Sequence, residues 1–140
     1  MLNLDTSTAF GAQVARRLAE ERMIWLTTVR ADLTPQPSPV WFLWKDGEFL
    51  IYSEPNTQKL RNIARSSNVA LHFDGDGRGG DIVVFAGTAR IDPQAPPAHQ
   101  VAAYAQKYAW GFERNGWTAQ QFAELYSVPI LVAPTSLRGH

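Results

Sequence analysis

The residues best suited to chemistry lie in one cationic segment near the middle of the sequence. No acidic residue occurs between Pro55 and Phe73, whereas Lys59, Arg61 and Arg65 bring three positive charges to that stretch. The chain as a whole carries 13 basic and 13 acidic residues, so this local excess is not part of a general positive field. Such a segment could bind an anion, and a phosphate group fits its chemistry.

Apolar residues at helical spacing predict a helix from Asn56 to Ser66, with its first residue or Thr57 as the N-cap. Lys59 and Arg61 would then lie in the first turns, where the positive end of the helix dipole is mildly unfavourable for cations. A bound anion reverses that penalty, so free N–H groups, the Thr57 hydroxyl and the Lys59 ammonium predict a phosphate site. The same pattern fits an ordinary solvated helix face on which Arg65 complements the C-terminal dipole.

A second candidate is the aromatic run Val40-Trp41-Phe42-Leu43-Trp44. Strand alternation places Trp41 and Leu43 on one face and Phe42 and Trp44 on the other, so the two aromatic sets cannot share one core. One face could line the interior of a barrel while the other meets a second subunit, or a planar ligand could lie along the strand. Because a large apolar area on a small chain favours association, we expect a homodimer.

Other motifs in the sequence match known binding or catalytic patterns only in part. The stretch Gly75–Gly80 satisfies G-x-G-x-x-G, but it precedes a predicted strand instead of a helix, so we expect a hairpin loop and no dinucleotide site. Asp74 and Asp76 begin a calcium-loop pattern, but Arg78 occupies the next ligand position and Phe85 that of the bidentate glutamate, so calcium is not expected. The sequence has no cysteine and no G-x-S-x-G motif, and its three histidines are scattered. Metal and hydrolytic chemistry are therefore not expected.

The composition predicts one folded domain over residues 1–140. Hydrophobic residues make up 45% and charged residues 19%, which is typical of a globular protein. The balanced charge gives no reason to expect a nucleic-acid or membrane partner. No signal sequence or long apolar run is evident, so we expect a cytoplasmic protein.

The periodicity of the chain predicts six strands and four helices. Proline at 35, 37 and 39 should delay the second strand, and the first three strands should form a β-meander with an Asp-Gly turn at Asp46-Gly47. Gly87 should mark a bulge or a close backbone approach. Strands and helices do not alternate as in βαβ units, so the fold class is α+β, mainly β: a six-stranded antiparallel barrel with flanking helices. The predicted strands are Met23–Arg30, Val40–Lys45, Phe49–Ser53, Val69–Phe73, Ile82–Ile91 and Val128–Val132; the helices are Thr8–Arg22, Asn56–Ser66, Ala98–Tyr108 and one that Thr118 and Gln121 open as a capping box.

Four segments carry a resemblance to a known family: Thr27-Thr28-Val29-Arg30, Pro35-Gln36-Pro37-Ser38-Pro39-Val40-Trp41-Phe42, Phe49-Leu50-Ile51-Tyr52-Ser53 and Thr57-Gln58-Lys59-Leu60-Arg61-Asn62. In order and spacing they resemble the pyridoxamine 5′-phosphate oxidase-like superfamily, and within it the flavin/deazaflavin oxidoreductases that use coenzyme F-420. The likeness extends from about Leu18 to Val132. It implies a split β-barrel of the FMN-binding type, a homodimer, and a cofactor in each of two clefts at the interface.

The resemblance also implies a role for each matching residue. Those beside the cofactor ring would be Pro39, Val40 and Trp41, with Thr28 and Val29 on the neighbouring strand. Tyr52 and Ser53 would approach the ribityl chain, and the phosphate would be held by Thr57, Gln58, Lys59, Arg61 and Asn62. Where FMN oxidases of the superfamily often have an Arg-Lys pair, this sequence has Gln58-Lys59, which removes one bidentate phosphate clamp. We therefore expect F-420 as the cofactor, with FMN as the alternative.

The implied activity is hydride transfer between the deazaflavin and a small organic substrate that the sequence does not identify. The cofactor would perform that step, and the protein would supply orientation and exclusion of water. No catalytic residue is identifiable; Tyr104, Tyr108 and His72 are proton donors by chemical type alone. A protein that binds a flavin or deazaflavin without turnover needs the same cleft, so this alternative stays open.

Overall fold

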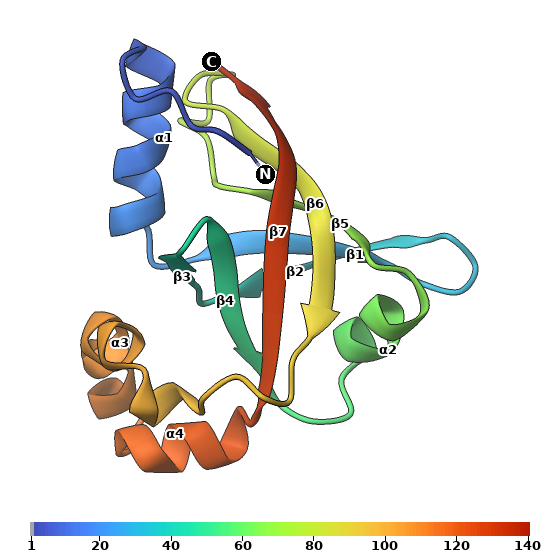
Figure 1. Cartoon of the computed structure of the whole chain (residues 1–140), viewed down its shortest axis with the longest axis vertical. Coiled ribbons are helices and arrows are strands. Elements are labelled where there is room, and N and C mark those ends of the chain that lie inside the picture. Colours follow the sequence, from blue (N-terminus) through green and yellow to red (C-terminus); the bar gives the residue numbers. More distant parts are fainter. Residues whose placement is uncertain (1) are drawn as a thin grey trace.

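The computed structural model describes residues 2–140 and contains one antiparallel sheet of seven strands (Figure 1). Neighbouring strands follow the order β2-β1-β5-β6-β7-β4-β3, and every pair is antiparallel. This arrangement confirms the predicted fold class, with one strand more than expected. The strands are β1 (Ile24–Val29), β2 (Pro35–Val40), β3 (Leu43–Lys45), β4 (Glu48–Ser53), β5 (Asn68–His72), β6 (Val83–Ile91) and β7 (Val128–Gly139).

The two edges of the sheet, β2 and β3, are joined in the chain by Trp41 and Phe42 alone. A link of two residues spans only about 10 Å, so the edges must lie close together and the sheet must curl into an incomplete barrel. Figure 1 shows this curl, with β1 and β2 crossing behind the long strands β6 and β7. The edge strands do not pair with each other, so the predicted β-meander is wrong: β1–β2 and β3–β4 are separate hairpins.

The proline-rich stretch forms strand β2, which the sequence did not predict. Its three prolines alternate along the strand, opposite Trp25, Thr27 and Val29 of β1. In an antiparallel edge strand every second residue turns its N–H away from the neighbour, so prolines at that period cost no ladder hydrogen bond. The predicted strand Val40–Lys45 is accordingly divided between β2 and β3 at the Trp41-Phe42 link.

The last strand, β7, continues seven residues beyond its predicted end at Val132. Pro134 does not terminate it, because the β6–β7 register shifts between Ala86 and Gly87 and leaves Thr135 as an extra residue. A Cβ at Gly87 would lie 2.5 Å from the Ala133 carbonyl oxygen, so the predicted bulge is confirmed and requires glycine. The predicted turn at Asp46-Gly47 is also present, with a positive φ at both residues.

In the described part of the chain four α-helices flank the sheet: α1 (Ala9–Glu20), α2 (Gln58–Arg65), α3 (Ala102–Arg114) and α4 (Ala119–Leu125). All four occur where helices were predicted. A short 3₁₀ turn, Ala98–Gln100, precedes α3, which continues one and a half turns beyond the predicted end at Tyr108. The predicted capping box opens α4, because Thr118 and Gln121 exchange side-chain and backbone hydrogen bonds. In Figure 1, α3 and α4 lie together beyond one end of the barrel.

The apolar side chains form two cores on opposite sides of the sheet. The first lies inside the barrel and includes Phe42, Phe49 and Phe85. The second lies between the outer side of β4 and the helices α3 and α4, where Trp41 packs with Tyr104, Tyr108 and Phe122. The two faces predicted for the aromatic run are thus confirmed, but helices of the same chain cover the Trp41 face, where a partner subunit was one alternative.

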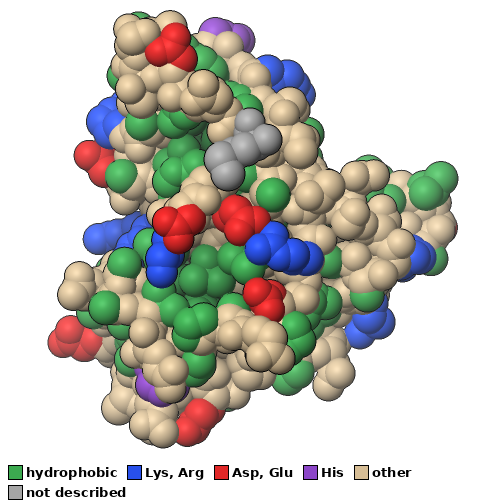
Figure 2. All heavy atoms as spheres, in the orientation of Figure 1, with side chains coloured by type: hydrophobic (Ala, Val, Ile, Leu, Met, Phe, Trp, Pro, Cys, Tyr) green, Lys and Arg blue, Asp and Glu red, His purple; other side chains and the backbone are tan. Residues whose placement is uncertain are grey.

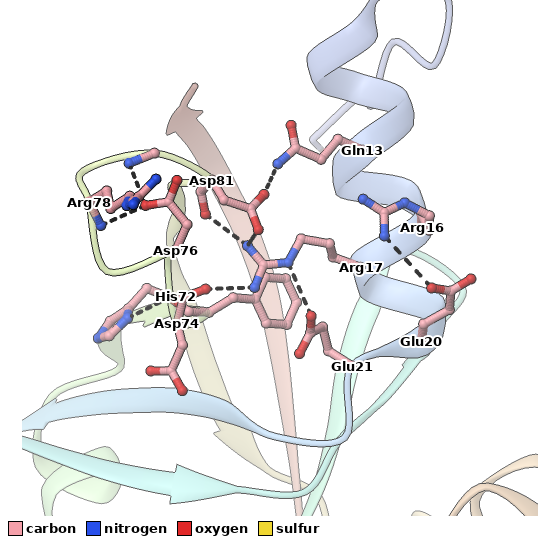
Figure 3. Close-up of polar contacts among 12 residues, drawn as sticks. Gln13, Arg16, Arg17, Glu20, Glu21, His72, Asp74, Asp76, Arg78 and Asp81 are labelled. Carbon is pink, nitrogen blue, oxygen red and sulfur yellow. Dashed lines mark hydrogen bonds and ion pairs between the residues drawn. The ribbon is translucent and has the colours of Figure 1, made fainter.

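Helix α1 is attached to the barrel through the buried guanidinium of Arg17 (Figure 3). Only 5% of this residue is exposed, yet its polar atoms are satisfied. Nη1 donates to the Asp81 carbonyl at 2.9 Å, Nη2 to the Asp74 carbonyl at 2.7 Å, and Nε to the Glu21 carboxylate at 3.2 Å. The guanidinium carbon also lies 4.8 Å from the centre of the Phe73 ring. Arg17 therefore holds the loop between β5 and β6 against α1.

Replacing Arg17 with alanine should destabilise the fold by roughly 3 kcal/mol, because the carbonyl groups of Asp74 and Asp81 and the Glu21 carboxylate lose a buried, charged donor. The matched control is Arg16→Ala on the same helix, whose exposed pair with Glu20 at 3.8 Å contributes at most about 0.5 kcal/mol. Urea unfolding of the two variants measures the difference. Equal losses would contradict a structural role for Arg17.

Candidate functional site

A cleft of about 450 Å³ lies between the sheet, the start of α2 and the α3–α4 pair. The ends of β2 and β4 form one side, and the beginning of α2 extends it. The second side comes from segments more than forty residues further along the chain. The lining residues are Pro39, Val40, Trp41, Tyr52, Ser53, Glu54, Thr57 and Lys59 from the first side, and Tyr104, Asn115, Trp117, Phe122 and Tyr126 from the second.

One end of this cleft is suited to an anion. Thr57 is the N-cap residue of α2, but its side chain makes no capping bond and instead lies 3.1 Å from the Ser53 hydroxyl oxygen. The first N–H groups of α2 are therefore left without a side-chain acceptor. Lys59 is half-buried, and within residues 2–140 no carboxylate lies within 4.0 Å of its ammonium. Burial lowers the pKa of Lys59, with Glu54 acting in the opposite direction, so a bound anion would stabilise its charged form.

The other end of the cleft is aromatic. The Trp41 indole lies parallel to the Tyr108 ring, with centroids 4.5 Å apart, and 5.6 Å from the Phe122 ring. Trp117 and Tyr126 pack around Phe122 and extend the aromatic lining. Such walls favour a flat ring, which can stack on or against them.

Three neighbouring tyrosines differ in what their hydroxyls contact. Tyr52 donates to the Pro96 carbonyl at 2.7 Å, and burial raises its pKa to about 12. Tyr108 donates to the Arg22 carbonyl at 2.7 Å and accepts from the Phe42 N–H at 2.8 Å. Tyr104 lines the cleft, and its hydroxyl is buried and has no hydrogen-bond partner within residues 2–140. Tyr52 and Tyr108 are thus bound to backbone groups, whereas Tyr104 is not.

Seven of the twelve predicted cofactor-binding residues line the cleft: Pro39, Val40, Trp41, Tyr52, Ser53, Thr57 and Lys59. The structure brings these together in one cleft from the ends of β2 and β4, the start of α2 and the residues beside them. The other five, Thr28, Val29, Gln58, Arg61 and Asn62, do not line it.

Those five residues instead hold α2 in place. Asn62 is fully buried and donates to the Thr28 hydroxyl and to the Gln36 side-chain oxygen, both at 3.0 Å. Gln58 donates to the Asn62 side-chain oxygen at 2.8 Å, and Arg61 binds the Asn56 carbonyl and the Gln58 side chain. The Val29 carbonyl accepts a hydrogen bond from Arg65. In the described structure these side chains position the anion end of the cleft and do not face it.

Five lining residues were not predicted as part of a site: Glu54, Asn115, Trp117, Phe122 and Tyr126. Phe122 and Tyr126 occur at helical spacing, which by itself indicates core packing, and all but Glu54 lie far from β2 and β4 in the chain. No local pattern could have assigned those four to the cleft, because only the packing of α3, α4 and the segment between them against the barrel places them there.

Two other candidates lie elsewhere. His72 is on the outer side of β5, where it stacks on Trp25 with ring centroids 6.4 Å apart, so it is not a donor in this cleft. The glycine-rich loop is a hairpin connection, as expected, and the Asp76 carboxylate accepts N–H bonds from Arg78 and Gly80 within it. Residues 2–140 contain no group of three His, Asp or Glu placed to hold a metal ion. No helix in the same range is long and apolar enough to cross a membrane.

The family model described as pyridoxamine 5′-phosphate oxidase matches residues 10–128 of the chain. The chain belongs to this family. The match covers strands β1 to β6, α2 and the α3–α4 pair, and so includes every residue that lines the cleft, whereas β7 lies almost wholly beyond it. None of the curated proteins compared with the chain matches it in sequence.

Solved structures share the fold over most of its length. A structure described as an F420 reductase has 25% sequence identity, a TM-score of 0.67, and an alignment covering 88% of this chain and 94% of that chain. A conserved hypothetical protein from Mycobacterium tuberculosis has 23% identity, a TM-score of 0.70, and coverage of 91% and 81%. A heme storage protein from Vibrio cholerae has 16% identity, a TM-score of 0.61, and coverage of 99% and 95%. The last two show the common fold alone.

Proposed function

We propose that this protein is an oxidoreductase that binds a flavin-type cofactor, preferably F-420, and exchanges a hydride with a small organic substrate. The observation that carries this proposal is the combination, in one cleft, of an aromatic end and an anion end at the uncapped start of α2. Membership of the family and the similarity to the F420 reductase support it.

The residues of the cleft fit such a cofactor. A ring system needs flat apolar walls, which Trp41, Trp117 and Phe122 provide. A phosphate needs N–H donors and a cation, which the start of α2 and Lys59 provide. The buried hydroxyl of Tyr104, without a partner in the described structure, is a polar group that a ligand could satisfy.

When bound, the reduced cofactor supplies the hydride. The protein contributes position and environment: Pro39, Val40 and Trp41 orient the ring, while Thr57 and Lys59 hold the phosphate. The α3–α4 pair covers the aromatic end and limits access of water to a transferred hydride. Orientation and a dry site are the contributions that a protein makes when the cofactor performs the chemistry.

The preference for F-420 follows from the cations near the anion end. Gln58 occupies the position at which an Arg-Lys pair has its arginine, and its side-chain amide donates a hydrogen bond to the Asn62 side-chain oxygen. Arg61 is bound to the Asn56 carbonyl and to Gln58, outside the cleft lining. Lys59 is thus the cation in the lining of the cleft. The phosphodiester of F-420 carries one negative charge and the phosphate monoester of FMN carries up to two. One ammonium therefore neutralises the F-420 phosphodiester more completely than the FMN phosphate.

Titration of the purified protein with F-420 and with FMN, followed by quenching of cofactor fluorescence, tests this preference. We expect the dissociation constant to be lower for F-420. A protein that purifies yellow, with stoichiometric FMN that F-420 does not displace, would contradict the preference.

A protein that binds the cofactor without turnover is the second candidate. The charged residues in the lining are Glu54 and Lys59, and the lining has no imidazole. The Glu54 carboxylate lies near both the Lys59 ammonium and the Tyr126 hydroxyl, so the aromatic walls formed by Trp41, Trp117 and Phe122 have no proton-transfer group of their own. Mixing the protein loaded with reduced F-420 with quinones and enones separates the two functions. Oxidation faster than that of free F-420 supports an enzyme, and oxidation at the same rate supports a binding protein.

Lys59→Ala should weaken F-420 binding about 10- to 150-fold, because it removes a charge-assisted contact to the phosphate. The stability of the free protein should change little, since a cation near a helix N-terminus contributes nothing favourable there. The control is Arg65→Ala at the other end of α2, which removes the same charge but contacts the Val29 carbonyl. Titrations of both variants at two salt concentrations are decisive, because diffuse charge effects are screened more than a bound pair. Equal weakening by both would place the phosphate elsewhere.

We also propose that the protein is a homodimer that associates through the outer side of β1, β2 and β5. The residues of that side are exposed or partly exposed and include no Asp, Glu, Lys or Arg: Trp25, Thr27, Val29, Pro35, Pro37, Pro39, Ala70 and His72. Pro39 belongs both to this side and to the cleft lining, so a second copy seated here would border the cleft. On the face seen in Figure 2, by contrast, charges of both signs are interspersed among hydrophobic side chains.

Sedimentation should show a dimer at micromolar concentration. Ala70→Arg places a charge in the middle of the proposed interface and should yield a monomer with weaker cofactor binding. The control is Thr88→Arg, which is exposed on β6, outside the proposed interface, and should remain dimeric. A wild-type monomer that binds the cofactor normally would contradict the dimer.

A further inference from the structure

Tyr104 is distinguished from the residues around it by a buried hydroxyl with no partner. Three buried side-chain polar atoms in residues 2–140 lack a hydrogen bond, in His99, Tyr104 and Trp110. Of these three residues, Tyr104 alone lines the cleft. Buried polar groups are nearly always satisfied in folded proteins, so an exception at a cleft wall needs an explanation.

The position of the Tyr104 ring is fixed by its neighbours. The Tyr52 ring meets it edge to face with centroids 4.9 Å apart, the Tyr108 ring lies at 4.9 Å, and the Phe122 ring at 6.1 Å. Tyr52 and Tyr108 cannot satisfy its hydroxyl, because their own hydroxyls bind the Pro96 and Arg22 carbonyls. A rigid donor with no acceptor in the protein is preorganised for an acceptor on a ligand.

We propose that Tyr104 donates a hydrogen bond to a carbonyl oxygen of the flavin or deazaflavin ring and thereby selects the orientation of that ring in the cleft. Both ring systems carry carbonyl oxygens on the edge of the plane, where an aromatic wall leaves them accessible to a donor. This role rests on the function proposed above, and it adds a residue that the resemblance did not assign to cofactor binding.

The protonation of Tyr104 is consistent with a donor. Burial raises its pKa well above the ordinary value of 10.0, and the adjacent phenols of Tyr108 and Tyr52 raise it further. No Lys, Arg or His is among the groups that perturb it, so nothing there favours the phenolate. The hydroxyl therefore carries its proton at neutral pH, and its contribution to binding should not change between about pH 6 and 9.

The test compares two tyrosine-to-phenylalanine variants on the same helix. Tyr104→Phe should weaken binding of F-420 about tenfold, the loss expected for one hydrogen bond, without lowering the melting temperature of the free protein. Tyr108→Phe loses bonds to the Arg22 carbonyl and the Phe42 N–H, so it should lower the melting temperature. Weaker binding without loss of stability in Tyr104→Phe, beside loss of stability in Tyr108→Phe, distinguishes a hydroxyl that binds the ligand from one that holds the fold.

A second probe separates this role from the phosphate site. The riboflavin-level precursor of F-420 has the deazaflavin ring and ribityl chain but no phosphate. Its affinity should fall about tenfold in Tyr104→Phe and should not change in Lys59→Ala. If Tyr104→Phe binds both probes as tightly as the wild type, or loses stability as Tyr108→Phe does, the role is overturned while the proposed function stands. If the wild type binds neither F-420 nor FMN, the proposed function fails and the role of Tyr104 fails with it.

Discussion

The architecture depends on the two-residue link that joins the edges of the sheet. Trp41 and Phe42 connect β2 to β3, the first and last strands in the sheet order, so the sheet must curl. Adjacent side chains of an extended chain point to opposite sides. Phe42 therefore fills the barrel and Trp41 lies outside it, and the link contributes to both hydrophobic cores at once.

The same link fastens α3 and forms one wall of the cleft. Tyr108 binds the N–H of Phe42, and the Lys107 ammonium donates to the Phe42 carbonyl at 2.7 Å and lies 3.7 Å from the centre of its ring. Burial in this contact lowers the pKa of Lys107 to about 8. Gly111 of α3 allows the Trp41 indole to pack directly against the helix, because a Cβ at this position would lie 2.5 Å from the indole. The closure of the barrel and the aromatic end of the cleft thus share one set of contacts.

The anion end is positioned independently, by buried hydrogen bonds that lie behind it. Asn62 joins α2 to Thr28 of β1 and to Gln36 of β2, and Gln58 joins the same network. This explains how residues that match a family motif can lie outside the cleft lining. Their amides and hydroxyls fix where the first turn of α2 points, and that turn carries Thr57 and Lys59 into the cleft. A ligand that spans the cleft would connect two parts of the fold that are otherwise held by separate contacts.

The sequence by itself determined the elements and one side of the cleft. Period-two and helical patterns located the four helices and most strands, the Asp46-Gly47 turn, the Gly87 bulge and the cationic start of α2, because these depend on neighbours within a few residues. Strand β2 was not predicted from the sequence. A strand tolerates proline only at the edge of a sheet, and which strand is an edge is decided only when the strands have paired. The tertiary structure alone decided that Trp41 faces helices of its own chain, that Asn62 is buried, and that Tyr104 lacks a partner. Each of these is a contact between segments far apart in the chain, which local spacing does not encode.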